Sequence, residues 1–292
     1  MQQQLETAIK QKLSQYLLLS KDFRVQFVGG GSINETYRLQ FDDSKVFCKV
    51  NSATNFPGLF VKEKAGLALL EKQGVIKTPS VIDCFEAFGH QVLILEWVEE
   101  GLRTETFWKK FGEQLAALHH VTTESFGLEE DNYMGSVPQQ NKRQKDWIAF
   151  FTKQRLQPPI TKCTEKNLLG PNHLQLFEKL FLLLPDIFET TQKPSLLHGD
   201  LWSGNFICSH NHEPVLIDPA VYYGHRSMDL AMTTLFGGFH TSFYEAYDYH
   251  YSFPANYEEQ LAICNLYPLL IHLYLFGRSY LPQIEHTLNR LK

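Results

Sequence analysis

The sequence has no long apolar run, no excess of positive charge and no paired cysteine motif. Its most apolar stretches, residues 92–95 and 266–276, are much shorter than the roughly 20 residues that span a bilayer. The first six residues lack the basic and apolar regions of a secretory signal. The five cysteines, an odd number, include no Cys-x-x-Cys pair, so neither a disulfide framework nor a zinc site is indicated. We therefore expect a soluble protein of the reducing cytoplasm.

The charge balance argues against a nucleic-acid partner. Lysine and arginine number 27 against 32 aspartates and glutamates, which gives a formal net charge of -5. A general nucleic-acid-binding protein normally shows a basic domain or stripe. The expected partners are therefore small molecules or proteins, without nucleic acid and without a membrane, and the sequence does not determine the oligomeric state.

The apolar content is sufficient for a substantial core. The chain has 292 residues, of which 43% are hydrophobic and 20% charged. This composition argues against disorder and against a fibrous architecture, and the length predicts one or two domains.

The first third of the chain combines helical and strand patterns. Apolar residues at helical spacing predict an amphipathic helix over 5–19, and a second helix is expected over 59–73. Short segments rich in aromatic and β-branched residues, divided by turn residues, predict an antiparallel sheet. These strands are expected at 24–28, 35–41, 45–50, 80–88 and 91–98.

The rest of the chain is mainly helical in pattern. We therefore expect an α+β fold of two lobes, a small antiparallel-sheet lobe over 1–98 and a larger helical lobe over 99–292. A polar segment, 124–146, is long for a bare connection and is a candidate functional segment. Helical runs are expected at 107–118, 173–184 and 258–276, and short strands near 196–197, 205–208 and 215–217.

The residues with the clearest chemistry lie in the second lobe. Residues 198–205 read His-Gly-Asp-Leu-Trp-Ser-Gly-Asn, and Asp218 follows an apolar segment. Asp200 and Asn205 have the spacing of the Asp-x-x-x-x-Asn catalytic loop of kinases. Phosphoryl transfer needs one carboxylate to accept the proton of the attacking hydroxyl, which suits Asp200. It also needs oxygen ligands for Mg²⁺, which suits Asn205 and Asp218 if the segments between them form a hairpin. An ordinary Asx-rich turn is the alternative.

Two charged residues of the first lobe fit the same chemistry. Strand alternation over 45–50 places Lys49 on the face of Phe47, and helical periodicity places Glu63 among apolar residues. A charge in such a position is costly unless it is paired. Lys49 and Glu63 are therefore predicted to form an ion pair that directs the ammonium toward nucleotide phosphates, although either residue alone could be a solvated charge.

Weaker signals complete the predicted ATP site. Gly30, Gly31 and Ser32 could let backbone N–H groups approach phosphates, but they lack the Gly-x-Gly-x-x-Gly and Walker A spacings and could form a simple turn. Backbone groups at Glu96, Trp97 and Val98 could bind adenine, an expectation that rests on position alone. The paired histidines 119–120 are expected in solvated or capping roles, not as metal ligands.

The sequence resembles the fructosamine kinase (ketosamine kinase) family, within the aminoglycoside phosphotransferase and protein-kinase-like fold. The resemblance extends over most of the chain. The most specific similarities are Leu-Trp after Asp200 and Tyr-Tyr-Gly-His-Arg at 222–226. The other similar segments are Gly30–Asn34, Phe47–Lys49, Glu63 with Gly66 and Leu67, 131–141, Asp146-Trp147, and 218–220.

This resemblance implies an ATP- and Mg²⁺-dependent kinase with nucleotide-binding residues in 1–98 and catalytic and acceptor-binding residues in 99–292. The implied acceptor is the 3-hydroxyl of a fructosamine- or ribulosamine-type ketosamine, free or protein-bound, in a deglycation reaction. Trp202 and His272 are the implied substrate-binding residues, and 124–146 is expected to help select the acceptor. A core position is the alternative for Trp202.

Two departures from the family pattern matter, one for the acceptor and one for the nucleotide loop. Ser227 follows Gly-His-Arg, where the family often has an acidic residue. Ser32 stands where some relatives carry a cysteine, so a disulfide between two nucleotide loops is not available. The alternatives left open are a kinase for an aminoglycoside, an amino alcohol or a sugar, and an inactive nucleotide-binding module.

Overall fold

The computed structural model describes residues 1–17, 23–29, 33–41, 44–189 and 191–291. By its internal contacts the chain forms two compact units. Unit 1 comprises Met1–Arg103 and Ile207–Asp218, and unit 2 comprises Thr104–Phe206 and Pro219–Lys292. No helix in the described part of the chain is long and apolar enough to cross a membrane.

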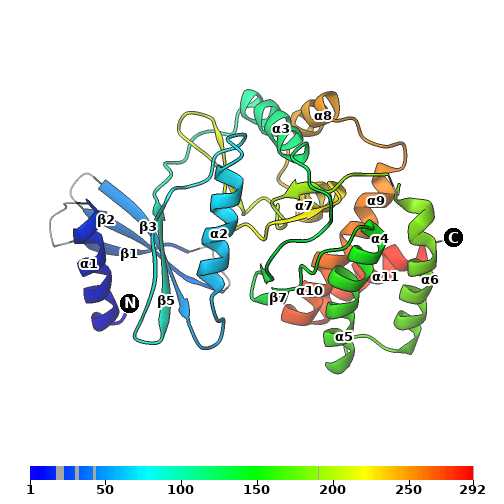
Figure 1. The fold of residues 1–292 in the computed structure, drawn as a ribbon, viewed down its shortest axis with the longest axis horizontal. Helices are drawn as coiled ribbons and strands as arrows, with labels where there is room; N and C mark the ends of the chain where they lie inside the picture. Colours follow the sequence, from blue (N-terminus) through cyan, green and yellow to red (C-terminus); the bar gives the residue numbers. More distant parts are fainter. Residues whose placement is uncertain (18–22, 30–32, 42–43, 190, 292) are drawn as a thin grey trace. The chain divides into compact units, whose positions relative to one another are not determined.

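Unit 1 contains a five-stranded antiparallel sheet of order β1-β2-β3-β5-β4 (Figure 1). This confirms the predicted meander and the two later strands, with every strand boundary within two residues of its predicted position. The strands are β1 (Arg24–Phe27), β2 (Glu35–Phe41), β3 (Ser44–Ser52), β4 (Val81–Ala87) and β5 (His90–Glu96).

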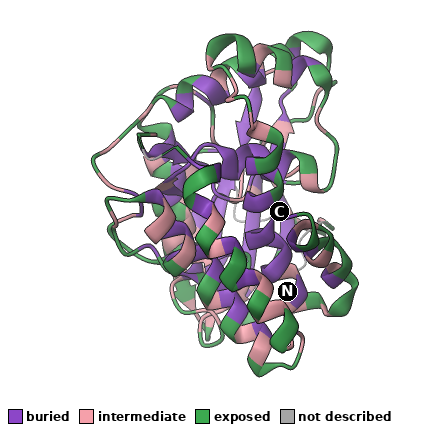
Figure 2. Ribbon diagram, turned by 90° about the vertical axis from the view of Figure 1, so that its right-hand side faces the viewer, coloured by how far each residue is buried: buried purple, intermediate pink, exposed green. Residues whose placement is uncertain are grey.

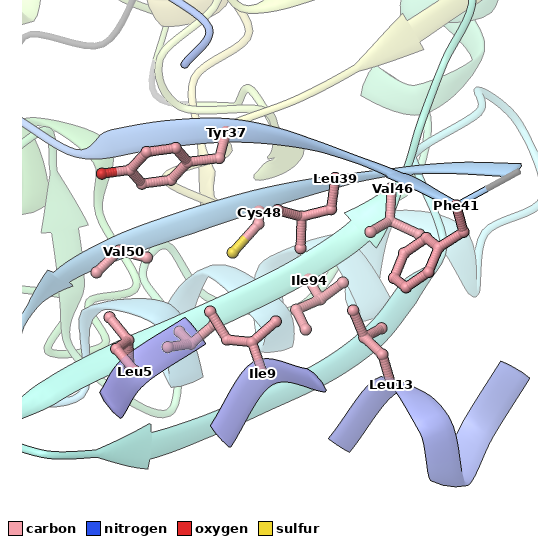
Figure 3. Packing of buried hydrophobic residues seen from close by; sticks show 11 residues of the cluster. Leu5, Ile9, Leu13, Tyr37, Leu39, Phe41, Val46, Cys48, Val50 and Ile94 are labelled. Carbon is pink, nitrogen blue, oxygen red and sulfur yellow. The ribbon is translucent and has the colours of Figure 1, made fainter. Parts of the chain in front are cut away.

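The predicted first helix, α1 (Gln3–Leu17), covers one face of this sheet. Its apolar stripe, Leu5, Ile9 and Leu13, packs on side chains of β2, β3 and β5 (Figure 3). Cys48 lies in this cluster, completely buried. Because successive side chains of a strand point to opposite faces, the neighbouring Lys49 is directed to the other face, toward α2 (Leu59–Glu71).

The boundary expected at residue 98 differs from the observed units, because a short hairpin far along the chain belongs to unit 1. This hairpin pairs β9 (Phe206–Cys208) with β10 (Pro214–Leu216), as the apolar segments predicted. Val215 forms a bridge with Lys77, and Ser209 forms one with Glu100. Sequence proximity could not reveal these long-range pairings, which bring Asp218 into the first unit.

Unit 2 is mainly helical, with short two-stranded pairings. Many of its helices carry both buried and exposed residues (Figure 2), whereas residues 227–233 and 266–271 are buried without interruption. The predicted helical run over 258–276 is broken at Asn265 into two helices, with Pro268 in the first turn of the second, where proline is tolerated. The strands are β6 (Asn132–Met134) paired with β7 (Val137–Gln139), and β8 (Ser195–Leu197) paired with β11 (Tyr222–Gly224).

The helical segments of unit 2 are as follows. They are α3 (Glu105–His119), α4 (Trp147–Phe150), the π-helix η1 (Phe151–Leu156), α5 (Gln157–Glu165), α6 (Pro171–Ile187), α7 (Ser227–Leu235), α8 (Thr241–His250), α9 (Tyr257–Cys264), α10 (Leu266–Phe276), the 3₁₀ turn η2 (Arg278–Tyr280) and α11 (Leu281–Asn289).

Candidate active site

Lys49 forms the centre of a buried charged cluster in unit 1. Its side chain is 2% exposed, and its Nζ donates to Glu63 Oε1 at 2.7 Å and to Asp218 Oδ1 at 2.5 Å. The predicted Lys49–Glu63 ion pair is therefore present. The contact with Asp218 was not predicted, because it depends on the long-range placement of the β9–β10 hairpin.

The cluster has one ammonium group, that of Lys49, and two carboxylates, those of Glu63 and Asp218. Burial by itself lowers the pKa of Lys49, but the Asp218 and Glu63 carboxylates outweigh it and raise that pKa above its ordinary value. Burial raises the pKa of Glu63 to about 7, with Lys49 opposing the shift and Asp218 adding to it. Lys49 therefore remains a cation, and a further positive charge would be stabilised at this cluster.

Asp218 has an unusual backbone. Its φ of 55° lies in the left-handed region, which is costly for a residue with a Cβ. Its side chain is 39% exposed, although it contacts the buried Lys49. Backbone strain of this kind concentrates at functional sites, which agrees with the role that the sequence predicts for this carboxylate.

The catalytic-loop motif forms a compact turn in unit 2. The Nδ2 of Asn205 donates to the backbone oxygen of Asp200 at 2.8 Å and to its Oδ2 at 3.1 Å. These bonds use the amide nitrogen, so the amide oxygen of Asn205 is the atom that a cation could bind. The predicted base and the predicted metal ligand, with four residues between them in the sequence, are thus hydrogen-bonded to each other directly.

A buried aspartate outside the predicted motifs holds the start of this loop. Asp229 on α7 is completely buried, and its carboxylate accepts from the backbone N–H groups of His198 at 2.7 Å and Gly199 at 2.8 Å. His119 lies 3.2 Å from the same carboxylate and 2.8 Å from the hydroxyl of Tyr247. Asp229 stands among the apolar residues of Met-Asp-Leu-Ala-Met, so its sequence context, like that of Glu63, indicates a charge that needs a partner.

The expectation of a solvated or capping His119 is wrong. The imidazole is 1% exposed, and burial lowers its pKa. The neutral ring therefore connects Tyr247 of α8 to Asp229 of α7. This position is a consequence of helix packing, which the local sequence does not show.

Glycine is required within the loop at residue 199. Its φ is 85°, and a Cβ there would lie 2.1 Å from the backbone oxygen of Ala220. That same oxygen accepts from Gln139 Nε2 at 3.1 Å, and Val221 O accepts from Asn132 Nδ2 at 2.8 Å. The polar segment 124–146 therefore contains the β6–β7 hairpin, which supports the backbone beside the catalytic loop. Its effect on acceptor choice stays a prediction.

The two predicted substrate-binding residues belong to one aromatic cluster. Trp202 is half-buried and meets Phe236 edge-on, with 5.9 Å between ring centroids. The ring of Phe236 also packs against that of His272, with 5.1 Å between the ring centroids. Trp202 therefore does not have the fully buried position of a core tryptophan, and its neighbour Phe236 lies outside the predicted motifs.

Segment 222–226, which has one of the most specific similarities to the family, packs within unit 2, as does the following Ser227. His225 is 2% exposed and contacts the rings of Trp147 and Phe188, while Arg226 donates to the backbone oxygens of Tyr251 and Ser252. Ser227, at the position where the family often has an acidic residue, is also buried and donates to Gln260 Oε1 at 2.9 Å.

His225 should make the protein less stable in acid. Burial lowers its pKa to about 3, whereas in the unfolded chain it titrates near 6.5. The unfolded chain thus binds a proton that the native protein does not. The resulting stability is present above about pH 6.5 and is lost as the pH falls toward 3, by about 2 kcal/mol between pH 7.5 and 5.

Urea unfolding at these two pH values tests this expectation. His225→Asn should show a smaller pH-dependent loss, by about that amount, and the exposed His286→Asn serves as the control. An unchanged pH dependence in His225→Asn would contradict the assignment. His119 contributes in the same direction and is intact in both variants.

The remaining predicted ATP-site residues are only partly described. Gly30, Gly31 and Ser32 lie outside the described residues. β5 ends at Glu96, so the chain leaves the sheet at Trp97 and Val98. Glu96 Oε2 accepts from the backbone N–H of Ser80 at 3.2 Å. The roles of all six residues in nucleotide binding stay predictions.

The fold is that of the protein-kinase-like phosphotransferases. The aminoglycoside phosphotransferase APH(4)-Ia shares it with a TM-score of 0.67 at 13% identity, over 98% of each chain. A Thermobifida fusca structure named "putative fructosamine-3-kinase" matches with a TM-score of 0.87 at 30% identity, over 97% of this chain and 98% of the other. This agreement confirms the expected fold class.

The sequence comparisons identify the family. The fructosamine kinase family model matches residues 1–292, and the chain belongs to this family. A protein of Lactiplantibacillus plantarum named "Probable ketoamine kinase" is 40% identical over 91% of this chain and 93% of its own length. A similarly named Synechocystis protein is 37% identical over 97% of this chain and 95% of its own length.

Proposed function

We propose that this protein transfers the γ-phosphoryl group of ATP to the 3-hydroxyl of fructosamine- or ribulosamine-type ketosamines. The observation that carries this proposal is the family match over all 292 residues. The presence of Lys49, Glu63, Asp200, Asn205 and Asp218 supports an active kinase. The phosphorylated product would break down and release the amine, so the reaction would reverse glycation in the cytoplasm.

Asp200 is the residue proposed to act as general base. The acceptor hydroxyl forms a bond to the γ-phosphorus, the bond from that phosphorus to the bridging oxygen of ADP breaks, and the hydroxyl proton passes to the carboxylate. Asn205 and Asp229 support this role from either side, because one bonds Asp200 itself and the other fixes the preceding backbone. Lys49 is proposed to bind the phosphates of ATP, positioned by Glu63.

The residues present fit a magnesium ion. Mg²⁺ prefers oxygen ligands and commonly takes one or two from the protein and the rest from water and phosphate. The Asp218 carboxylate and the Asn205 amide oxygen are donors of this kind. When bound, the ion would neutralise charge on the transferred phosphoryl group. No group of three His, Cys, Asp or Glu that could form a separate metal site occurs among the described residues.

Magnesium dependence gives a direct test of these two ligands. Asn205→Ala or Asp218→Ala should need a higher magnesium concentration for half-maximal activity, because each removes an oxygen ligand from the ion. A titration of activity with MgCl₂ at saturating ATP measures this shift. If both variants have the dependence of the unmodified protein, other groups hold the metal.

An acceptor panel tests the proposed substrate class. The enzyme is assayed with fructosamine and ribulosamine adducts, free and on a glycated protein, against aminoglycosides, choline and free sugars. Preference for the ketosamines supports the proposal. Preference for an antibiotic, an amino alcohol or a sugar would show a different small-molecule kinase, and no turnover of ATP with any acceptor would show an inactive nucleotide-binding module.

A further inference from the structure

Phe236 lies on a short turn that is held against the catalytic loop. The turn joins α7, which ends at Leu235, to α8, which begins at Thr241. Gly237 and Gly238 both have left-handed backbones, with φ of 70° and 91°. A Cβ at Gly238 would lie 2.6 Å from the Cβ of Ser203, so the turn approaches the residue after Trp202 as closely as glycine permits.

The far end of the same turn is anchored in the core of unit 2. The ring of Phe239 packs against those of Phe206 and Phe243, with 5.1 Å and 4.9 Å between the ring centroids. Phe236, in contrast, is 40% exposed. A large apolar side chain on a well-anchored turn, with its ring left partly open, is available to contact a ligand.

His272 adds a hydrogen-bond acceptor to this exposed ring. Its Nδ1 lies 2.7 Å from the backbone oxygen of Pro268. A carbonyl oxygen only accepts, so Nδ1 carries the proton. Burial lowers the pKa of His272, so the ring is neutral and Nε2 bears a lone pair. In the described part of the chain the side chain of His272 makes no other hydrogen bond.

Further aromatic rings surround this imidazole. Its centroid lies 5.0 Å from Tyr280 and 5.5 Å from Phe276, which is 52% exposed. Together with Phe236 these rings surround one neutral acceptor, and Trp202 extends the aromatic cluster through its contact with Phe236. Ring faces attract cations, and an imidazole lone pair accepts from an N–H group. Together these features suit an alkylammonium group.

We propose that Phe236, with His272, binds the secondary ammonium of the ketosamine and so distinguishes ketosamines from neutral ketoses. This inference rests on the proposed function, since it assigns the part of that substrate beyond the sugar. An amine attached to a sugar carbon is largely protonated near neutral pH, and it differs from a neutral sugar in charge and in N–H donors. Trp202 would contact the sugar, and Phe236 the adjoining nitrogen.

The test compares two acceptors that differ at one atom. The first is a fructosamine with a simple alkyl amine, and the second is the matching fructose 1-O-alkyl ether. The ratio of kcat/KM for the two substrates is measured in Phe236→Leu and Phe236→Tyr. Phe236→Leu keeps an apolar side chain but loses the ring, so the ratio should fall roughly 3- to 30-fold, whereas Phe236→Tyr should keep it. Phe88→Leu, the same change at an exposed position of unit 1, is the control.

Binding without ATP separates this inference from the proposed function. Calorimetric titration of the two acceptors should show the same change in preference. If Phe236→Leu lowers kcat/KM and the binding affinity by the same factor for both acceptors, Phe236 only maintains the shape of the region. The proposed ammonium site is then wrong. If the unmodified protein binds the fructosamine preferentially but never phosphorylates it, the proposed function fails while the binding site stands.

Discussion

Asp200→Asn should reduce kcat roughly 10²- to 10⁴-fold while the protein still folds and binds ATP. General-base assistance typically contributes a factor of this size. The substitution keeps the shape of the side chain, and the contacts of the loop with Asp229 use backbone N–H groups that it does not alter. The amide cannot accept the proton of the acceptor hydroxyl, so the loss should fall on the chemical step.

The measurement is kcat and ATP affinity for the variant, with circular dichroism to confirm folding. Asp186→Asn, the same change at an exposed position of α6, should leave all three values unchanged. A kcat near that of the unmodified protein would remove Asp200 from the mechanism. A loss of ATP affinity with normal kcat would give Asp200 a binding role instead.

Lys49→Met should have large effects on both activity and stability. It removes the cation that Glu63 and Asp218 share, and so leaves Glu63, whose side chain is only 10% exposed, without its partner. Removing one member of a buried pair typically costs about 3–5 kcal/mol. If the ammonium binds the phosphates of ATP, kcat/KM should also fall roughly 10²- to 10³-fold, as for the loss of other preorganised charges.

The double variant Lys49→Met/Glu63→Gln separates the two effects. It removes the unpaired carboxylate, so denaturant unfolding should show recovery of much of the lost stability, while activity should stay low. Lys64→Met, the same change at an exposed position of α2, is the control. Recovery of activity together with stability would mean that Lys49 serves the fold and not the nucleotide.

Local sequence patterns are sufficient to predict the elements of unit 1 and the composition of the catalytic loop. Strand alternation and helical periodicity are local properties, and they place Lys49 and Glu63 on faces of their elements that carry apolar residues, where each charge needs a partner. The Asp200–Asn205 contact is likewise accessible from the sequence, because a turn of fixed length brings its ends together. The family can be identified for the same reason, since its most specific motifs are short and continuous.

The distant groups that complete these elements are set by tertiary packing. Asp218 contacts Lys49 across 169 positions of sequence, and Asp229 reaches the loop across about 30. Phe236 meets His272 through the packing of a turn against α10. No periodicity fixes such contacts, because they depend on how whole helices and hairpins bury their apolar faces, and a polar side chain then takes the partner that this packing places within its reach.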